Sequence, residues 1–312
     1  MKLRTELKVK NELKINPFDG SVFLGSCFSD NIGSRFLELG FPTLVNPFGV
    51  IFHPEPLAQI LDHAAQEDFR YNSSHLLEFK GRHFSLFHHG SFSSKNAEEL
   101  LNRMNQSIEN LRIRLSNSKL LCLTLGTAWG YTYEDSVVAN CHKLPQKIFK
   151  KTLSSPPAVV ETLTDAIRNL RNAFPQLKVI LTVSPVRHVK DGLVENSRSK
   201  ANLISAVHEV CDRLNEVVYF PAYECVMDDL RDYRFYASDL IHPSTMAVDY
   251  VYSKFKTFAF MEDEVFMDLE KFRVLKNHRV LSKEESEIST HKELLLRKKE
   301  GLLVKYPNLE LD

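Results

Sequence analysis

The sequence predicts an α/β protein built on a central parallel sheet. Short apolar runs that end in glycine or proline alternate with long segments whose apolar residues recur at helical spacing. Strands joined by crossover helices pair in parallel and are covered on both faces, so they read as continuous apolar runs. The chain has 312 residues, of which 43% are hydrophobic and 26% charged, which suits one large globular domain with additions.

The first strand is predicted at Ser21 to Gly25, a short apolar run that ends in glycine. The polar residues after it lead into Ile32, Phe36 and Leu37, which recur at helical spacing. This pattern predicts a strand, a sharp turn and a helix.

Three further strands are predicted at 119–126, 178–184 and 217–220, each after an amphipathic helix. A helix is recognised by apolar residues at steps of three and four. The three stripes are Leu101, Met104, Ile108, Leu111 and Leu115; Val160, Leu163, Ile167, Leu170 and Phe174; and Leu203, Val207, Val210 and Leu214. A last helix is expected from about Ser244. Ligands of such sheets bind at the carboxyl ends of the strands.

Two segments, about 69–94 and 131–157, fall outside this alternation, and we expect them to be insertions over the active edge of the sheet. The composition changes toward Lys, Glu, Arg and Leu near the end of the chain. The sequence therefore predicts an α/β domain over residues 1–262 and a charged helical extension over 263–312. Its charged residues should form a solvated face.

The charge and cysteine content exclude several classes of protein. Forty basic residues balance forty acidic ones, so no overall charge draws the chain to nucleic acid or acidic lipid. No apolar run reaches the roughly 18 residues of a membrane span, and the basic amino terminus lacks the apolar segment of a signal peptide. Five cysteines without paired spacing indicate a reducing compartment. We expect a cytoplasmic protein that binds neither nucleic acid nor membrane; its oligomeric state stays open.

The turn after the first strand carries two candidate nucleophiles, Ser26 and Cys27. A side chain on a turn between a strand and a helix is exposed at the sheet edge, and the helix amino terminus stabilises negative charge beside it. A simpler interpretation is a glycine turn followed by a helix cap at Ser29 or Asp30.

A candidate base lies before the last predicted helix, in a segment that contains Asp239 and His242. A carboxylate three residues before a histidine can bond the imidazole Nδ1 and leave Nε2 to take a proton from a nucleophile. The alternative is that Asp239 caps the turn and that His242 is an ordinary surface residue.

Taken together, the two segments resemble the first and last blocks of SGNH (GDSL-type) hydrolases, which read G-D-S and D-x-x-H. The sequence also resembles the GSCFA family of the SGNH-like superfamily over about residues 20–255. The block that gives the family its name reads Gly25-Ser26-Cys27-Phe28-Ser29 here, with serine where the name has alanine. Further stretches similar to that family lie at 46–52, 125–129, 140–143, 183–186 and 219–224. The resemblance implies a flavodoxin-like three-layer αβα sandwich, and it implies no particular substrate.

The resemblance also shows departures from the hydrolase pattern. Aligned with G-D-S, Cys27 takes the nucleophile position, and a thiol beside a histidine and a helix amino terminus is expected to have a lowered pKa. Ser26 would serve if the turn is rotated by one residue. Alanine, Ala128, stands where the pattern has the oxyanion asparagine, and loss of one such donor typically costs about 3 kcal/mol of transition-state stabilisation.

Other residues are therefore candidates for the oxyanion and substrate site. Gly49 resembles the glycine that the second conserved block of SGNH enzymes contributes to the oxyanion hole. The other candidates are Asn46, Gly126, Thr127, Trp129, Asn140 and His142. Of these, His142 is also a second possible base. No metal or other cofactor is expected, because His83, His88 and His89 match no standard zinc spacing and SGNH chemistry needs no metal.

The leading functional hypothesis is an esterase or deacylase that uses Cys27 or Ser26 as nucleophile, with His242 and Asp239 as base and orienting carboxylate. A small-molecule or carbohydrate acyl ester is the expected substrate, by analogy with the superfamily. The alternatives are an acyltransferase of the same fold and a ligand-binding or carbohydrate-binding module that has lost the chemistry.

Overall fold

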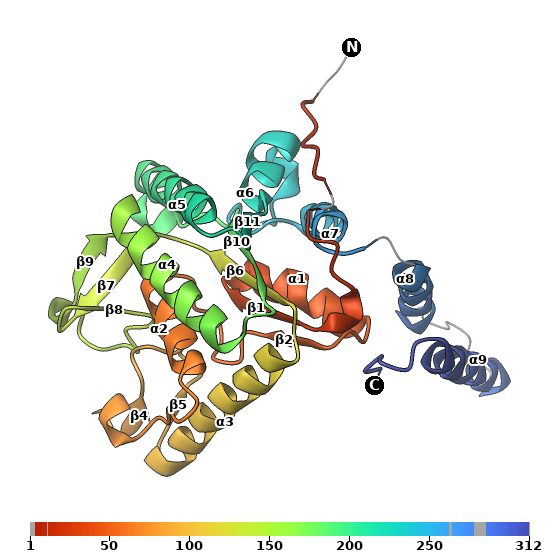
Figure 1. Ribbon diagram of the computed structural model, residues 1–312, viewed down its shortest axis with the longest axis horizontal. Helices are drawn as coiled ribbons and strands as arrows, with labels where there is room; N and C mark the ends of the chain where they lie inside the picture. The colour runs from red at the N-terminus through yellow and green to blue at the C-terminus, as the bar shows by residue number, and fades with distance from the viewer. Residues whose placement is uncertain (1–3, 11, 262–263, 278–284, 312) are drawn as a thin grey trace.

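The computed structural model describes residues 4–10, 12–261, 264–277 and 285–311 (Figure 1). A five-stranded sheet lies at its centre, formed by β1 (Ser21–Gly25), β2 (Thr43–Val45), β6 (Leu120–Leu125), β10 (Lys178–Val183) and β11 (Val217–Tyr219). The strands are all parallel, in the order β11-β10-β6-β1-β2. This is the order of the flavodoxin-like fold. The predicted α/β fold is therefore confirmed, and the predicted strands agree with the observed ones to within one residue at each end.

Helices cover both faces of this sheet. On one face pack α2 (Pro54–Ala65), α3 (Ala97–Ser116), α4 (Pro156–Ala173) and α5 (Leu193–Arg213); on the other pack α1 (Cys27–Glu38) and α7 (Thr245–Ala259). After β11, the short α6 (Ala222–Glu224) runs into a π-helical turn, Cys225–Leu230. Successive strand side chains point to opposite faces. Val22 and Leu24 accordingly join the first core cluster, while Phe23 joins the second.

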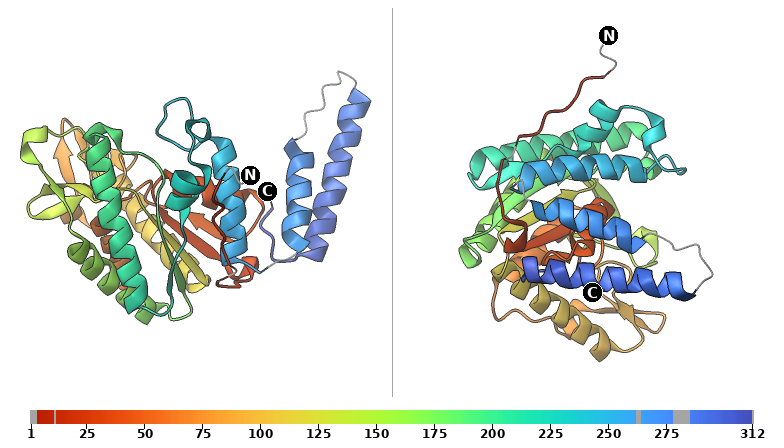
Figure 2. Two further views of the ribbon diagram at one scale, coloured as in Figure 1. Left: turned by 90° about the horizontal axis from the view of Figure 1, so that it is seen from above. Right: turned by 90° about the vertical axis from the view of Figure 1, so that its right-hand side faces the viewer.

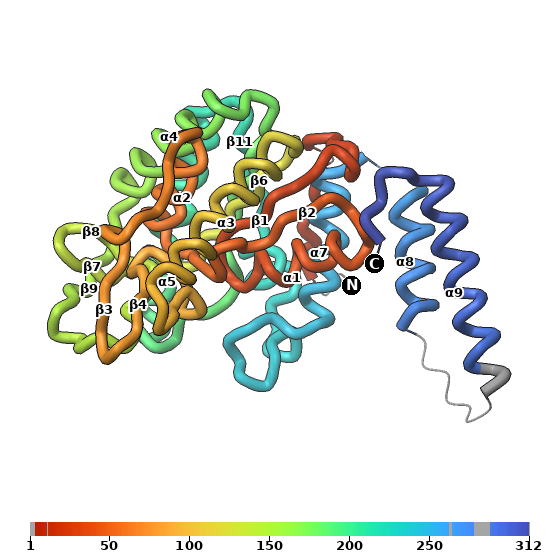
Figure 3. Tube along the Cα trace, turned by 90° about the horizontal axis from the view of Figure 1, so that it is seen from below, coloured from red at the N-terminus to blue at the C-terminus, as the bar shows by residue number. Residues whose placement is uncertain are grey.

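Both predicted insertions fold into small antiparallel sheets. The first contains β3 (Leu77–Phe79), β4 (Arg82–Phe84) and β5 (Ser93–Ser94), and the second contains β7 (Trp129–Tyr133), β8 (Ser136–Val138) and β9 (Lys150–Leu153). Trp129 was expected to end the strand before it, but it begins β7, so the second insertion starts two residues earlier than predicted. Figure 3 shows both sheets at the end of the molecule opposite the carboxyl-terminal helices.

The carboxyl-terminal region forms two helices, α8 (Glu264–Asn277) and α9 (Glu285–Lys305), which lie side by side and beside the α/β body (Figure 2). The chain then returns to the body, where Leu309 is buried and the Glu310 N–H donates to Gly40 O at 2.7 Å. The predicted domain boundary at 262–263 lies outside the described residues. Within the described ranges, none of the helices has the length and apolar character needed to cross a membrane.

Phe36 provides a test of the core on the α1 side. Its ring is 1% exposed and stacks on Phe23 at 5.6 Å, whereas the next residue, Leu37, is 43% exposed. We predict that Phe36→Ala lowers the free energy of unfolding by about 3–5 kcal/mol, because it removes buried ring contacts and leaves a cavity. Denaturant unfolding measures the effect. Leu37→Ala is the matched control and should change stability by less than about 1 kcal/mol; equal losses would contradict this packing.

Candidate functional site

The pairing register brings three strand ends to one edge of the sheet. Gly25 of β1 pairs with Thr124 of β6, and Val183 of β10 pairs with Leu125 of β6. The register continues past the strands, because the Ser26 N–H donates to Thr124 O at 3.0 Å and the Ser184 N–H donates to Leu125 O at 2.7 Å. Neighbouring strands lie about 4.8 Å apart. The segments that begin at Ser26, Gly126 and Ser184 therefore meet at the carboxyl edge.

Ser26 and Cys27 occupy different positions on the turn after β1. Ser26 is 3% exposed and caps α1, where its Oγ accepts the Phe28 N–H at 3.2 Å. The cap is therefore Ser26, not Ser29 or Asp30 as the simpler interpretation expected. Cys27 is the first residue of α1 and is only half-buried. Of the two candidate nucleophiles, Cys27 presents the more accessible atom to the edge.

The expectation that Cys27 has a lowered pKa is wrong for this structure. Burial raises the pKa of the Cys27 thiol, and the nearby Asp30 carboxylate raises it further. The helix amides and Lys200 oppose these effects without outweighing them. A charged sulfur in a partly desolvated site is costly, and the amino terminus of α1 is too weak to compensate. Cys27 is a neutral thiol at pH 7 and needs a proton acceptor before it attacks.

Asp239 and His242 form the predicted pair. His242 Nδ1 lies 2.7 Å from Asp239 Oδ2, and Asp239 Oδ1 accepts the backbone N–H groups of Ile241 and His242 at 2.9 and 3.0 Å. These hydrogen bonds lower the pKa of Asp239 to about 2, so the carboxylate stays charged at neutral pH. Leu240 between them has a positive φ of 57°. The pair leaves His242 Nε2 on the side of the ring away from Asp239, as a general base requires.

The loop that carries this pair is attached to the segment after β10. The Arg187 N–H donates to Ile241 O at 3.2 Å, and Arg187 Nη1 donates to Leu240 O at 3.2 Å. Next to it, His188 interacts electrostatically with both His242 and Lys200, and burial lowers the pKa of His188 to about 4. In the part of the chain that the structure describes, no hydrogen bond joins His242 to Ser26 or Cys27. His242 therefore lies on the same edge as the thiol but is not hydrogen-bonded to it in the described structure.

Asn46 and Gly49 lie beside the turn. Asn46 Oδ1 accepts the Gly25 N–H at 2.8 Å and Asn46 Nδ2 donates to Asp30 at 2.5 Å. The Gly49 N–H donates to Asn46 O at 2.8 Å. Gly49 also has a φ of +74°, and a Cβ there would lie 2.4 Å from His89 Cβ, so only glycine fits. These groups brace the turn, which engages the Gly49 N–H and one of the two Asn46 Nδ2 hydrogens.

The segment after β6 connects the sheet edge to α5. The Gly126 N–H donates to Phe52 O at 2.8 Å. Thr127 Oγ1 lies 2.8 Å from Ser199 Oγ and accepts the Trp129 N–H at 3.0 Å, while the Trp129 indole donates to Glu195 O at 3.2 Å. Gly126, Thr127 and Trp129 thus hold the edge in place, and these donors are engaged within the protein.

Asn140 and His142 lie on the second insertion, beside the first one. Asn140 Oδ1 accepts the His142 N–H at 2.8 Å, and the His142 ring stacks on Phe84 at 4.7 Å. His142 Nε2 lies 3.3 Å from His88 O, and burial lowers the pKa of His142. Among the residues placed in the structure, neither bonds to Ser26, Cys27 or His242. They are not brought into contact with the turn.

Lys200 is a site residue that the sequence analysis missed. It is 1% exposed, and its Nζ donates to Gly126 O at 2.5 Å and to Ser184 O at 2.6 Å, at the ends of β6 and β10. Burial lowers the pKa of Lys200 to about 7, and Cys27 opposes that shift. A signal was present in the sequence, because Lys200 stands three residues before Leu203 and seven before Val207, on their apolar stripe.

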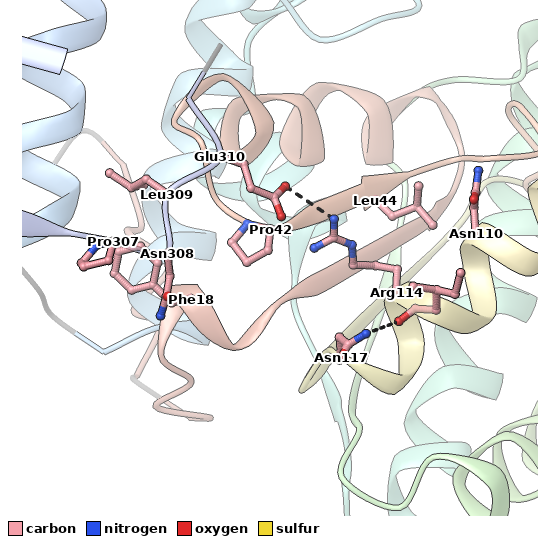
Figure 4. Close-up of a pocket in the computed structure, with 11 residues that line it drawn as sticks. Phe18, Pro42, Leu44, Asn110, Arg114, Asn117, Pro307, Asn308, Leu309 and Glu310 are labelled. Carbon is pink, nitrogen blue, oxygen red and sulfur yellow. Dashed lines mark hydrogen bonds and ion pairs between the residues drawn. The ribbon is translucent and has the colours of Figure 1, made fainter. Parts of the chain in front are cut away.

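A hollow of about 710 Å³ lies at the other end of the strands (Figure 4). Phe18 and Pro42 precede β1 and β2, and Asn117 precedes β6, so the hollow opens at the amino ends. The returning carboxyl terminus closes one side, where Glu310 approaches Arg114 at 3.5 Å. This hollow is separate from the edge that carries Cys27.

The chain was compared with known proteins. No curated protein matches the sequence. Two solved structures are similar at low identity: "a putative platelet activating factor from Streptococcus pneumonia" (16% identity, TM-score 0.33, 47% of this chain and 64% of that one) and "a carbohydrate esterase family 3 from Talaromyces cellulolyticus" (10%, 0.32, 81% and 99%). The chain thus spans less than two thirds of the first, and neither similarity bears on activity. The GSCFA family model matches residues 21–255, three quarters of the sequence, and the chain belongs to the GSCFA family.

Proposed function

We propose that the protein is an SGNH-like hydrolase that acts on acyl esters, with Cys27 as nucleophile. The observation that carries the proposal is the placement of a half-buried thiol and a carboxylate-bound imidazole on one carboxyl edge of a parallel sheet. Membership of the GSCFA family supports the assignment to the SGNH-like superfamily. An O-acetyl group on a carbohydrate is the substrate to test first, by analogy with the superfamily.

In the proposed reaction, Cys27 Sγ attacks the acyl carbonyl and its proton moves to His242 Nε2. A C–S bond forms, the tetrahedral intermediate collapses, and the C–O bond to the alcohol breaks as His242 returns the proton to the leaving oxygen. Water then attacks the thioester with His242 again as base, which releases the acid and the free thiol. Asp239 orients the imidazole and stabilises its charged form.

The distance between base and nucleophile must shorten when substrate binds. The His242 side chain is 47% exposed, on a loop that Arg187 holds to the segment after β10. We propose that this loop moves to bring His242 Nε2 to the thiol. Catalytic hydrogen bonds of free enzymes often tighten only in the substrate complex. The proposal therefore includes closure of the 239–242 loop over the thiol.

A second candidate is a ligand-binding module without hydrolytic activity. Two observations favour it: Ala128 stands at the asparagine position, and the described residues show no bond between His242 and Cys27. The two candidates differ in a single measurable property, which is turnover.

We predict that Cys27→Ala and His242→Ala each abolish hydrolysis of short-chain aryl esters and of an O-acetylated carbohydrate. Cys27→Ala removes the attacking atom and His242→Ala removes the proton acceptor. Ser26→Ala is the matched control, because it removes only the cap of α1. It should cost about 1 kcal/mol of stability and leave turnover within severalfold of wild type.

Loss of activity in Ser26→Ala alone would mean that the nucleophile is Ser26 and not Cys27. Turnover that survives all three substitutions would remove this edge as the active site. Saturable binding of the acylated carbohydrate without turnover, in wild type, would establish the binding module instead.

A separate prediction concerns the carboxylate. Asp239→Asn should lower kcat by roughly 100-fold or more with little change in KM, because an amide cannot both fix the imidazole tautomer and stabilise its charge. Asp232→Asn is the control, since Asp232 caps a nearby exposed turn through the Arg234 N–H in the same manner. Steady-state kinetics of both variants give the comparison; equal effects would mean that Asp239 acts only as a cap.

A further inference from the structure

A buried cation interacts electrostatically with the half-buried thiol, and no family motif quoted above includes it. Lys200 projects from α5 to the carboxyl edge, where Gly126 O and Ser184 O hold its Nζ at 2.5 and 2.6 Å. Gly126 follows β6 and Cys27 follows β1, and the two strands pair from Ser21–Leu120 to Gly25–Thr124. Both segments therefore leave from the same level of neighbouring strands, which lie about 4.8 Å apart.

The position of Lys200 is well defined, because two carbonyls fix the ammonium and the side chain is 1% exposed. Taking a lysine out of water is costly. The neighbouring positions on the same stripe, Leu203 and Val207, are apolar and buried in the core. The packing of α5 therefore does not require a charge at position 200. Two backbone acceptors satisfy two of its three N–H groups, which leaves one for the site.

Several charged groups face this thiol and this amine. Asp30 acts on Cys27 from the thiol's own helix, α1, and Lys200 acts on it from α5. Lys200 also interacts with His188, which in turn interacts with Asp191 and His242. His89 acts on Asp30 from the first insertion. The thiol is therefore subject to opposing effects from one carboxylate and one buried ammonium.

We propose that Lys200 is a positioning residue whose ammonium stabilises the Cys27 thiolate. Asp30 has the opposite effect on the same sulfur. The proposal deepens the proposed function, since it concerns the nucleophile, yet it holds for the thiol whether or not the protein hydrolyses esters.

The proton balance predicts a particular pH dependence. A proton leaves Cys27 Sγ for solvent, and the resulting thiolate is stabilised only while Lys200 carries its own proton. Because the pKa of Lys200 lies at about 7, the ammonium predominates below that pH and the neutral amine above it. The two groups titrate as a coupled pair. Removing the lysine charge should thus slow thiolate chemistry most at or below neutral pH and progressively less at higher pH.

The test is the alkylation rate of Cys27 by iodoacetamide from pH 6 to pH 10, followed by mass spectrometry of the Cys27 peptide in the full chain. Lys200→Met removes the charge and both donors, whereas Lys200→Gln removes the charge but keeps an amide that donates to the two carbonyls. Arg198→Met, an exposed residue of the same helix, is the control for a general loss of positive charge. Asp30→Asn is the variant of opposite sign.

We expect alkylation at pH 6.5 to be about tenfold slower in Lys200→Gln and Lys200→Met, which corresponds to about one pKa unit. The ratio to wild type should shrink toward one as the pH rises well above 7. Asp30→Asn should react faster than wild type, and Arg198→Met should react at the wild-type rate. Circular dichroism shows which variants are folded.

A folded Lys200→Gln chain with the wild-type rate at every pH would overturn the proposal. A slowing that is the same at pH 6.5 and pH 10 would also overturn it, because that pattern belongs to altered access and not to charge. If neither lysine variant folds, Asp30→Asn decides the sign of the electrostatic account in an otherwise intact site. Ester hydrolysis plays no part in this alkylation measurement, so a failure of this proposal can be told apart from a failure of the proposed function.

Discussion

The parallel pairing of β1 and β10 on the two sides of β6 is the constraint on which the rest of the site depends. It brings the ends of three strands to the same edge, and each of these ends contributes differently. The turn after β1 provides the thiol of Cys27, while the turns after β6 and β10 provide the carbonyls that hold Lys200. A shift in the register would separate these groups, because each is positioned by backbone and not by side-chain packing alone.

Burial has opposite consequences for the two ionisable groups at this edge. It raises the pKa of Cys27 and lowers the pKa of Lys200, so each group is driven toward its neutral form. Charge on one favours charge on the other, so the ammonium form of Lys200 lowers the cost of forming the Cys27 thiolate. His242 interacts electrostatically with His188 and is bound to an ionised Asp239. The edge thus carries a half-buried thiol near a buried amine and, on an exposed loop, a carboxylate-bound imidazole.

Much of this arrangement was predictable from sequence. Gly25 at the end of an apolar run predicted the turn that presents Ser26 and Cys27, and the D-x-x-H spacing predicted the bond between Asp239 and His242. Other features depend on three-dimensional context. The raised pKa of Cys27 follows from burial and from Asp30, and Asn140 and His142 lie against the first insertion because of contacts distant in the sequence. Lys200 was overlooked because a lysine on a helix is usually solvated, although its place on the apolar stripe was visible.

The central claim is that Cys27 forms a covalent acyl intermediate. The most direct measurement is rapid quenching of the wild-type chain with an activated acetyl ester, followed by peptide mass spectrometry that locates the acyl group. We expect a thioester at Cys27 that hydroxylamine removes and that forms before acetate is released. An acyl group on Ser26, or steady turnover while Cys27 remains unmodified, would contradict it.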